Sequence, residues 1–131
     1  MPGKDGVHMQ IGEVAACTEL SIRTLRHYDE LGLVTPSARS QGGFRLYTGD
    51  DVDRLLVIRR MKPLGFTLVE MKELLAALDV LGDTTAAASA RTEASAVLRD
   101  FQAKTEESAD RLRRHLAYAG EFAELLEQRR T

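Results

Sequence analysis

The stretch RTLRHYDELGLV, residues 23–34, places two arginines, a histidine and a tyrosine in one short segment with a helical pattern. At about 100° per residue, one arc of the expected helix is polar and the opposite arc is mainly apolar. The polar arc consists of Arg23, Arg26, His27 and Glu30, with Thr24 at its edge, while Leu25 and Tyr28 lie opposite. Taken alone, the polar arc has two interpretations, the solvated face of an amphipathic helix or a face that contacts a ligand.

The residues before and after this helix predict a helix-turn-helix. IGEVAACTEL, residues 11–20, has apolar residues at helical spacing and predicts a first short helix. Ser21 is a good N-cap for a second helix that runs to about Leu31, and Gly32 follows as the residue after its C-cap. Two short helices with a tight turn are typical of motifs whose second helix enters a DNA major groove. The polar arc is therefore expected to face DNA.

The next segment predicts a β-hairpin and two more helices. In VTPSARSQGGFRLYT, residues 34–48, Gly42-Gly43 separates two short alternating runs, which is typical of a hairpin turn. Thr48 or Asp50 is expected to cap a third helix over about 50–62, which Pro63 and Gly65 end. A fourth, amphipathic helix over 68–78 is ended by Gly82.

The C-terminal third predicts a long helix that pairs with a second copy of the chain. From Thr84 to about Gln128 there is no proline and only one glycine, Gly120, which is expected to end or kink the helix. One row of the helix recurs every seven residues, and an apolar stripe without a domain to cover it predicts a homodimer. The expected interface residues are Leu98, Phe101, Thr105, Leu112, Leu116 and Ala119.

Composition limits the class of protein. The net charge is −2, but residues 21–62 hold eight Arg or Lys against five Asp or Glu, which favours a phosphate-facing patch in the N-terminal half. A single cysteine excludes an intrachain disulfide and a multi-thiolate metal site. No apolar run approaches the ~18 residues of a membrane span, so no membrane contact and a cytoplasmic location are expected. Residues 1–8 are expected to be a flexible tail.

The order of IGEVA, RTLRHYDELGLV, GGFRLYT and DVDRLLVIRRMKPLGFTLVEMKELL resembles the DNA-binding half of MerR-family transcriptional regulators. The resemblance covers residues 9–80 and implies a mainly α fold, a winged helix-turn-helix followed by a long antiparallel coiled-coil helix, here 84–118, with a short terminal helix at 119–131. It implies a homodimer on double-stranded promoter DNA that bends and untwists the promoter spacer and thereby controls RNA polymerase. No cofactor is implied, and a small-molecule effector is left unidentified.

The resemblance also assigns residues to the DNA-binding surface. In the recognition helix, His27-Tyr28 stands where the family has an aromatic-Tyr pair. In the wing, Pro36–Tyr47, Arg45 and Tyr47 match phosphate contacts, and Phe44 replaces a common tyrosine. Lys62 matches a basic backbone contact beside a second wing that turns at 65–67. The expected DNA-binding residues are Ser21, Arg23, Thr24, Arg26, His27, Tyr28, Arg39, Phe44, Arg45, Tyr47 and Lys62.

Three other hypotheses are weaker. Cys17 could be a sensor thiol, but a lone cysteine in the turn region is more often a packing residue. His115 could be a ligand, although a helix-interface histidine usually has a structural partner. No catalytic trio, phosphate loop or metal-ligand spacing is visible, so neither an enzyme nor a metal site is expected.

The alternative function is an architectural, excisionase-like DNA-binding protein that responds to no effector, which the long C-terminal helix disfavours.

Overall fold

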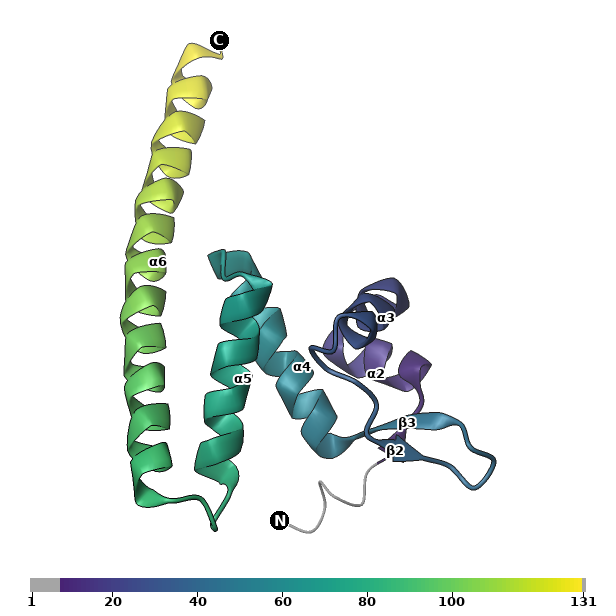
Figure 1. The fold of residues 1–131 in the computed structure, drawn as a ribbon. Helices are drawn as coiled ribbons and strands as arrows, with labels where there is room; N and C mark the ends of the chain where they lie inside the picture. Colours follow the sequence, from purple (N-terminus) through teal and green to yellow (C-terminus); the bar gives the residue numbers. More distant parts are fainter. Residues whose placement is uncertain (1–7, 131) are drawn as a thin grey trace. The chain divides into compact units, whose positions relative to one another are not determined.

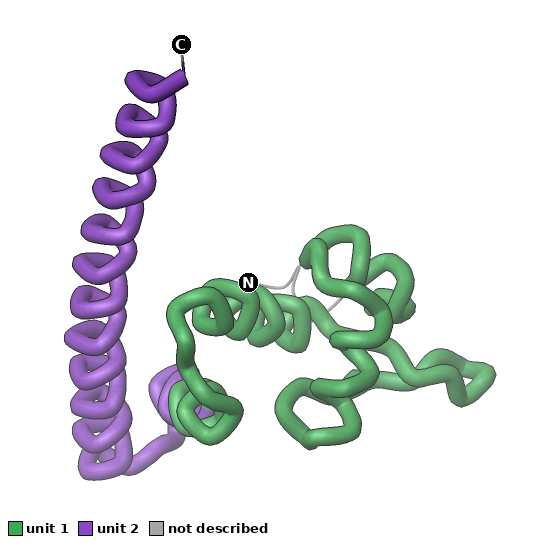
Figure 2. Tube along the Cα trace, turned by 90° about the horizontal axis from the view of Figure 1, so that it is seen from above, with its two compact units in different colours: residues 1–75 green, residues 76–131 purple. Residues whose placement is uncertain are grey.

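The computed structural model describes residues 8–130 (Figure 1). It divides into two compact units, residues 1–75 and 76–131, with the boundary inside helix α5, Leu68–Gly82 (Figure 2). The first unit contains short helices and a small sheet, and the second contains the end of α5 and the long helix α6, Ala88–Arg129. This confirms the predicted fold class, a mainly helical chain with a small wing and a long C-terminal helix.

The helix-turn-helix forms where the sequence predicts it. Helix α2 runs over Ile11–Thr18 and α3, the recognition helix, over Ile22–Glu30. Glu19 has a left-handed φ of 60° and turns the chain between them, while the buried Thr18 hydroxyl accepts a hydrogen bond from the Leu20 amide at 3.3 Å. Ser21 caps α3, and Gly32 follows with a φ of 69°. Both residues act as predicted, because cap and turn conformations depend mainly on local sequence.

The wing belongs to a three-stranded antiparallel sheet. Its strands are β1 (His8–Met9), β2 (Ala38–Arg39) and β3 (Arg45–Thr48), in the order β1-β3-β2. β2 and β3 form the predicted hairpin, whereas β1 was not predicted. His8 pairs with Thr48 and Met9 with Tyr47, so the expectation of a tail over 1–8 is wrong at His8. The rest of that tail, 1–7, lies outside the described residues.

Helix α4, Gly49–Met61, begins at a capping box that also ties down the wing. Thr48 is the N-cap, and its hydroxyl accepts from the Asp51 amide while Asp51 accepts from the Thr48 amide, at 3.1 and 2.9 Å. The same Asp51 carboxylate, nearly buried, accepts from the amide and hydroxyl of Ser37 at 3.0 and 2.7 Å. One side chain therefore fixes both the start of α4 and the start of the hairpin.

The core of the first unit forms around α4, which contacts α2 and β3. Its most deeply buried side chains come from four different elements: Val14, Leu25, Tyr47, Leu55 and Ile58. Burial of each aliphatic side chain contributes about 1.5–3 kcal/mol. Beyond α4, the 3-10 helix η1 (Lys62–Leu64) and Gly65, with a φ of 87°, turn the chain into α5. The core thus holds α2, α3 and the wing on one scaffold.

The second unit differs from the predicted boundaries. Helix α6 begins at Ala88 rather than 84, because Asp83 holds Thr85 in a turn through hydrogen bonds of 2.9 and 2.7 Å. It then continues through Gly120 to Arg129, so the separate terminal helix over 119–131 is not formed. A single helical glycine costs only about 1 kcal/mol, which the helix-forming neighbours offset. Among the described residues, no helix is long and apolar enough to cross a membrane.

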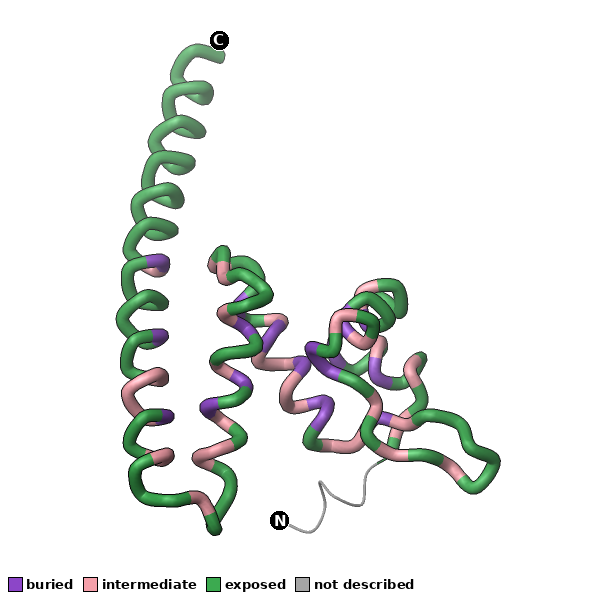
Figure 3. The backbone as a smooth tube through the Cα atoms, in the orientation of Figure 1, coloured by how far each residue is buried: buried purple, intermediate pink, exposed green. Residues whose placement is uncertain are grey.

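Burial along α6 is uneven (Figure 3). Ala94, Phe101 and Ser108 are buried within the single chain, whereas all residues from Asp110 to Arg130 are exposed. Of the predicted interface residues, Leu98 is half-buried and Phe101 is already covered, so the Phe101 ring is not part of the open surface. Four remain exposed: Thr105, Leu112, Leu116 and Ala119. Their pairing with a second copy stays a prediction.

Candidate DNA-binding surface

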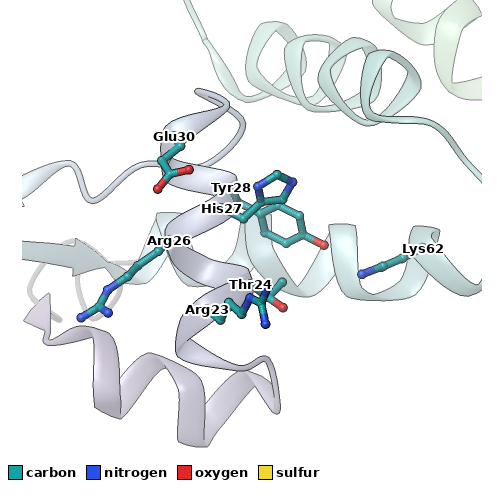
Figure 4. A pocket seen from close by; sticks show the side chains of 7 residues that line it. All are labelled: Arg23, Thr24, Arg26, His27, Tyr28, Glu30 and Lys62. Atoms are coloured by element: carbon teal, nitrogen blue, oxygen red, sulfur yellow. The ribbon is translucent and has the colours of Figure 1, made fainter.

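The outer face of α3 forms one wall of an open hollow of about 560 Å³. Figure 4 shows its lining, six side chains from α3 and one from η1. The lining residues are Arg23, Thr24, Arg26, His27, Tyr28, Glu30 and Lys62. Six of these seven belong to the predicted DNA-binding set, so the structure gathers the recognition helix and Lys62 at one site. Glu30 was placed on the polar arc but not among the predicted contacts.

The cap orients the start of the recognition helix. The Ser21 hydroxyl accepts from the Thr24 amide at 3.0 Å and donates to the Thr24 hydroxyl at 2.9 Å. The Ser21 and Thr24 hydroxyls are therefore held together at the helix N-terminus, where free amides and the helix dipole favour a phosphate. Arg23 is the second residue after the cap, and Arg26 lies about one turn further along the same polar face.

The two faces of α3 separate as the helical pattern predicts. Leu25 is fully buried, and Tyr28 is 3% exposed, while Arg23, Arg26 and His27 are exposed. The His27 and Tyr28 rings lie 6.3 Å apart between centroids and are tilted by 38°. In Figure 4 the Tyr28 hydroxyl and the Lys62 ammonium point toward one another across the hollow. Tyr28 is thus mainly a core residue whose polar end reaches the site.

The wing hairpin presents an aromatic side chain next to a fixed turn. Arg39 donates to the Gly43 carbonyl at 3.1 Å, and the Ser40 hydroxyl accepts from the Phe44 amide at 3.1 Å. Gly43 has a φ of 84°, which an L side chain rarely adopts, so the turn depends on glycine there. These contacts leave Phe44 71% exposed. A ring this open on a wing is free to meet a DNA groove or backbone.

Two further contacts were not predicted from the sequence. Arg45, in β3, donates two hydrogen bonds to the Asp29 carboxylate in α3, which ties the wing to the recognition helix. Arg59, in α4, donates to the Thr18 carbonyl at 2.9 Å and so fixes the end of α2. Neither pair has a local signal, since its members lie far apart in the sequence.

Tyr47 does not lie where the resemblance implied. Its side chain is 2% exposed and forms part of the core. Burial raises the pKa of Tyr47, and the nearby Asp29 carboxylate adds to the rise, while Arg45 opposes it. The expected phosphate contact from Tyr47 is therefore not supported, since its ring is enclosed.

Cys17 is exposed, so the expectation that it packs as a small, semi-buried thiol is wrong. The last turn of α2 directs Thr18 into the core instead, and the Cys17 thiol donates to the Val14 carbonyl over 3.6 Å. Within residues 8–130, no group of three or more His, Cys, Asp or Glu is placed to hold a metal ion. His115 lies exposed on α6.

A basic recognition helix with a hairpin wing on a shared core defines a winged helix-turn-helix DNA-binding protein. Family models agree: residues 9–78 match "MerR HTH family regulatory protein", and residues 52–130 match "MerR, DNA binding". The chain belongs to the MerR family.

Individual relatives place the chain among regulators. It is 40% identical over 85 residues to the HTH-type transcriptional regulator CueR of Vibrio cholerae, an alignment that covers 65% of this chain and 61% of CueR. Among solved structures, it is similar to the regulator PbrR691 of Ralstonia metallidurans in complex with lead(II), at 31% identity and a TM-score of 0.55 over 91% of this chain and 86% of that one. HiNmlR, bound to promoter DNA, shares the fold at 24% identity and a TM-score of 0.61, over 94% of this chain and 87% of that one.

These matches extend over part of the curated relatives. The alignment covers less than two thirds of CueR and 53% of the mercuric resistance operon regulatory protein of Bacillus cereus. They identify the family and the fold, and the family consists of transcriptional regulators rather than enzymes.

Proposed function

We propose that this chain is a transcriptional regulator that binds double-stranded promoter DNA as a homodimer. The observation that carries the proposal is the hollow along α3, where Arg23, Arg26 and Lys62 present three cationic groups beside His27. Arginine and lysine reach phosphates or the guanine acceptors N7 and O6, and Glu30 is placed to accept from a cytosine amino group. The solved complex of HiNmlR with promoter DNA supports the same use of this fold.

The wing extends the contact surface beyond one groove. Arg39, Phe44 and Arg45 lie on the hairpin, on both sides of its turn, and would contact the backbone next to the major groove that α3 enters. Two such wings in a homodimer would grip the DNA at two places. Bending and untwisting the promoter spacer costs about 1–6 kcal/mol, which the added backbone contacts would offset. This distortion would bring the promoter elements into register for RNA polymerase.

The described residues of this chain offer no ligand set for a metal effector such as the lead(II) of PbrR691. The chain has one cysteine, exposed on α2, and its described residues contain no metal-holding group. We therefore carry no metal over from that neighbour. The function proposed is promoter binding and control of RNA polymerase in the cytoplasm, with any small-molecule effector unidentified.

A footprint and a transcription assay on the chain's own upstream DNA test the proposal. We expect protection of a pseudo-palindrome between two promoter hexamers, with altered output from RNA polymerase. Arg26→Ala should abolish protection at concentrations where Arg114→Ala, which removes the same charge from an exposed site on α6, protects fully. Protection without any change in transcription would instead indicate the architectural alternative. Equal loss of protection in both variants would show that α3 is not the element that recognises the DNA.

A further inference from the structure

The second unit contains a hollow that is separate from the DNA-binding surface. It lies beside the end of α5 and the first turns of α6 and has a volume of about 300 Å³. Its lining residues are Leu81, Arg91, Thr92, Ser95 and Arg99. All five belong to residues 76–131, so a single compact unit forms the hollow. Promoter binding by α3 and the wing gives this hollow no role.

Helical spacing places the polar lining residues on one side of α6. Arg91, Ser95 and Arg99 follow one another at intervals of four residues, which sets them within an arc of about 80° over about 12 Å of the helix axis. Side chains on a helix lean toward its N-terminus, so the Arg99 side chain extends back toward Ser95. Leu81, from α5, adds an apolar side chain to the same hollow. The hollow therefore combines two guanidinium groups and a hydroxyl with one apolar contact.

The positive charge of the two arginines is not neutralised by an ion pair. Among residues 8–130, no carboxylate pairs with Arg91 or Arg99. Arg91 donates to the backbone carbonyl of Asp83 at 3.0 Å, while the Asp83 carboxylate accepts from the amide and hydroxyl of Thr85 at 2.9 and 2.7 Å. These bonds from Thr85 lower the pKa of the Asp83 carboxyl, and the charge of Arg91 adds to the effect. Both arginines keep N–H groups for a ligand, since each guanidinium carries five.

This set of donors fits a phosphate group. A phosphate monoester carries a charge of about −1.5 to −2 at pH 7 and has three strong acceptor oxygens. Two arginines match that charge, and the half-buried Ser95 hydroxyl can donate to the remaining oxygen. The Thr92 hydroxyl already donates to the Ala88 carbonyl at 3.0 Å, so Ser95 is the hydroxyl that serves the ligand. Leu81 can contact the carbon substituent of an ester.

The surroundings favour a small ligand over a nucleic-acid backbone. The hollow is at the lower end of the range of small-molecule sites, about 300–1,000 Å³. The exposed carboxylates of Glu93 and Asp100 lie in the same turns of α6. They would repel the neighbouring phosphates of an extended polyanion, whereas a single compact anion can avoid them.

We propose that the hollow of the second unit binds a small phosphate monoester. Arg91 and Arg99 hold the phosphate oxygens together with the Ser95 hydroxyl, and Leu81 contacts the organic substituent. Arg91 is positioned by its hydrogen bond to the Asp83 carbonyl. The site is a property of the second unit and stands apart from the proposed binding of promoter DNA.

Calorimetric titration of the full chain with n-propyl phosphate, without DNA, tests the site. We expect one ligand bound per chain, and Arg99→Gln should raise the dissociation constant about tenfold, because it removes a charge-assisted hydrogen bond. Ser95→Ala should raise it about threefold. Arg114→Gln, which removes the same charge from another exposed position of α6, is the matched control and should change it little. Circular dichroism checks that each variant folds. A folded chain that binds no n-propyl phosphate, or equal losses in Arg99→Gln and Arg114→Gln, would overturn the proposal.

A comparison of anions tests whether the hollow recognises an ester. Inorganic phosphate and sulfate should bind about tenfold more weakly than n-propyl phosphate, because they lack the carbon atoms that contact Leu81. Leu81→Ala should remove most of this preference and leave the affinity for inorganic phosphate unchanged. Equal affinity for all three anions would show an unspecific cationic surface and would overturn the site.

DNA binding by the same variant distinguishes a free phosphate ester from a DNA phosphate. Arg99→Gln should leave the slope of log DNA affinity against log salt unchanged, as Arg114→Gln should. A slope lowered by about one unit in Arg99→Gln, in a chain that binds no n-propyl phosphate, would place a DNA phosphate at Arg99 and overturn the small-molecule site. A chain that binds n-propyl phosphate but no promoter DNA would overturn the proposed function and leave this site standing.

Discussion

The guanidinium of Arg45 in β3 donates two hydrogen bonds to the carboxylate of Asp29 in α3, with N–O distances of 2.9 and 3.0 Å. The two side chains are 48% and 23% exposed, so water screens the pair only in part. A two-bonded arginine–carboxylate pair fixes direction as well as distance. It therefore sets the angle between the hairpin wing and the recognition helix.

This pair should contribute measurable coupling to the stability of the first unit. We expect a double-mutant cycle with Asp29→Asn and Arg45→Lys to give about 0.5–1 kcal/mol of coupling in the free energy of unfolding, measured by urea denaturation. Lysine keeps the charge of arginine but cannot form the two parallel bonds. The exposed pair Arg113–Asp110, at 2.8 Å, is the control and should show less coupling. Equal coupling in the two pairs would mean that the Arg45 geometry adds nothing.

Arg45 is also expected to contact DNA phosphate, because its remaining N–H groups are not used by Asp29. Arg45→Ala should weaken binding to all DNA sequences alike and lower the slope of log affinity against log salt by about one unit. Fluorescence anisotropy over a salt series measures both quantities. Arg114→Ala, on α6, should leave the slope unchanged. An unaltered slope for Arg45→Ala would show that the Asp29 pair keeps Arg45 away from DNA.

The elements predicted correctly have short-range causes. Ser21 caps α3, and Gly32 turns the chain after it, because both conformations depend on neighbouring residues. Thr48 rather than Asp50 caps α4, because Asp51 completes a capping box with it. Gly120, by contrast, neither ends nor separates α6, since a single glycine is tolerated within a long helix.

The features that were missed depend on contacts between distant parts of the chain. Alternation in the hairpin places Arg45 and Tyr47 on the same face, but the folded first unit leaves Arg45 exposed and buries Tyr47. The strand β1 is two residues long and has no periodic pattern to reveal it. The Asp29–Arg45 pair likewise has no local signal. The outer face of α3 could be predicted because its helical periodicity is itself local.

Tyr47 gives the first unit a predictable loss of stability at alkaline pH. Its raised pKa means that the folded chain keeps a proton which the unfolded chain releases near pH 10. The contribution to stability is therefore complete below about pH 10 and is lost as the pH rises toward the folded-state pKa. Tyr47→Phe should reduce this loss, measured as the free energy of unfolding between pH 8 and 11.

The same variant tests the role of Tyr47 toward DNA. Because the side chain is buried, Tyr47→Phe should bind DNA at neutral pH with unchanged affinity. Phe44→Ala, which removes a ring that is 71% exposed on the wing, is the comparison and should weaken binding. A loss of affinity in Tyr47→Phe alone would show that the Tyr47 hydroxyl contacts a DNA phosphate, as the family resemblance implied.

Whether His27 of α3 contacts a base or a phosphate can be tested directly. It is exposed in the hollow between Arg26 and Tyr28 and has donor and acceptor nitrogens that suit a base edge as well as a phosphate. We expect His27→Ala to lose about 1–3 kcal/mol of discrimination at one operator position, while its affinity for sequences already altered there changes little. Anisotropy titrations of a single-substitution operator series at fixed salt measure this. Lys62→Ala is the control for a backbone contact and should weaken binding to every operator equally. A uniform loss with His27→Ala as well would place its imidazole on a phosphate and assign base reading to Arg23 and Arg26.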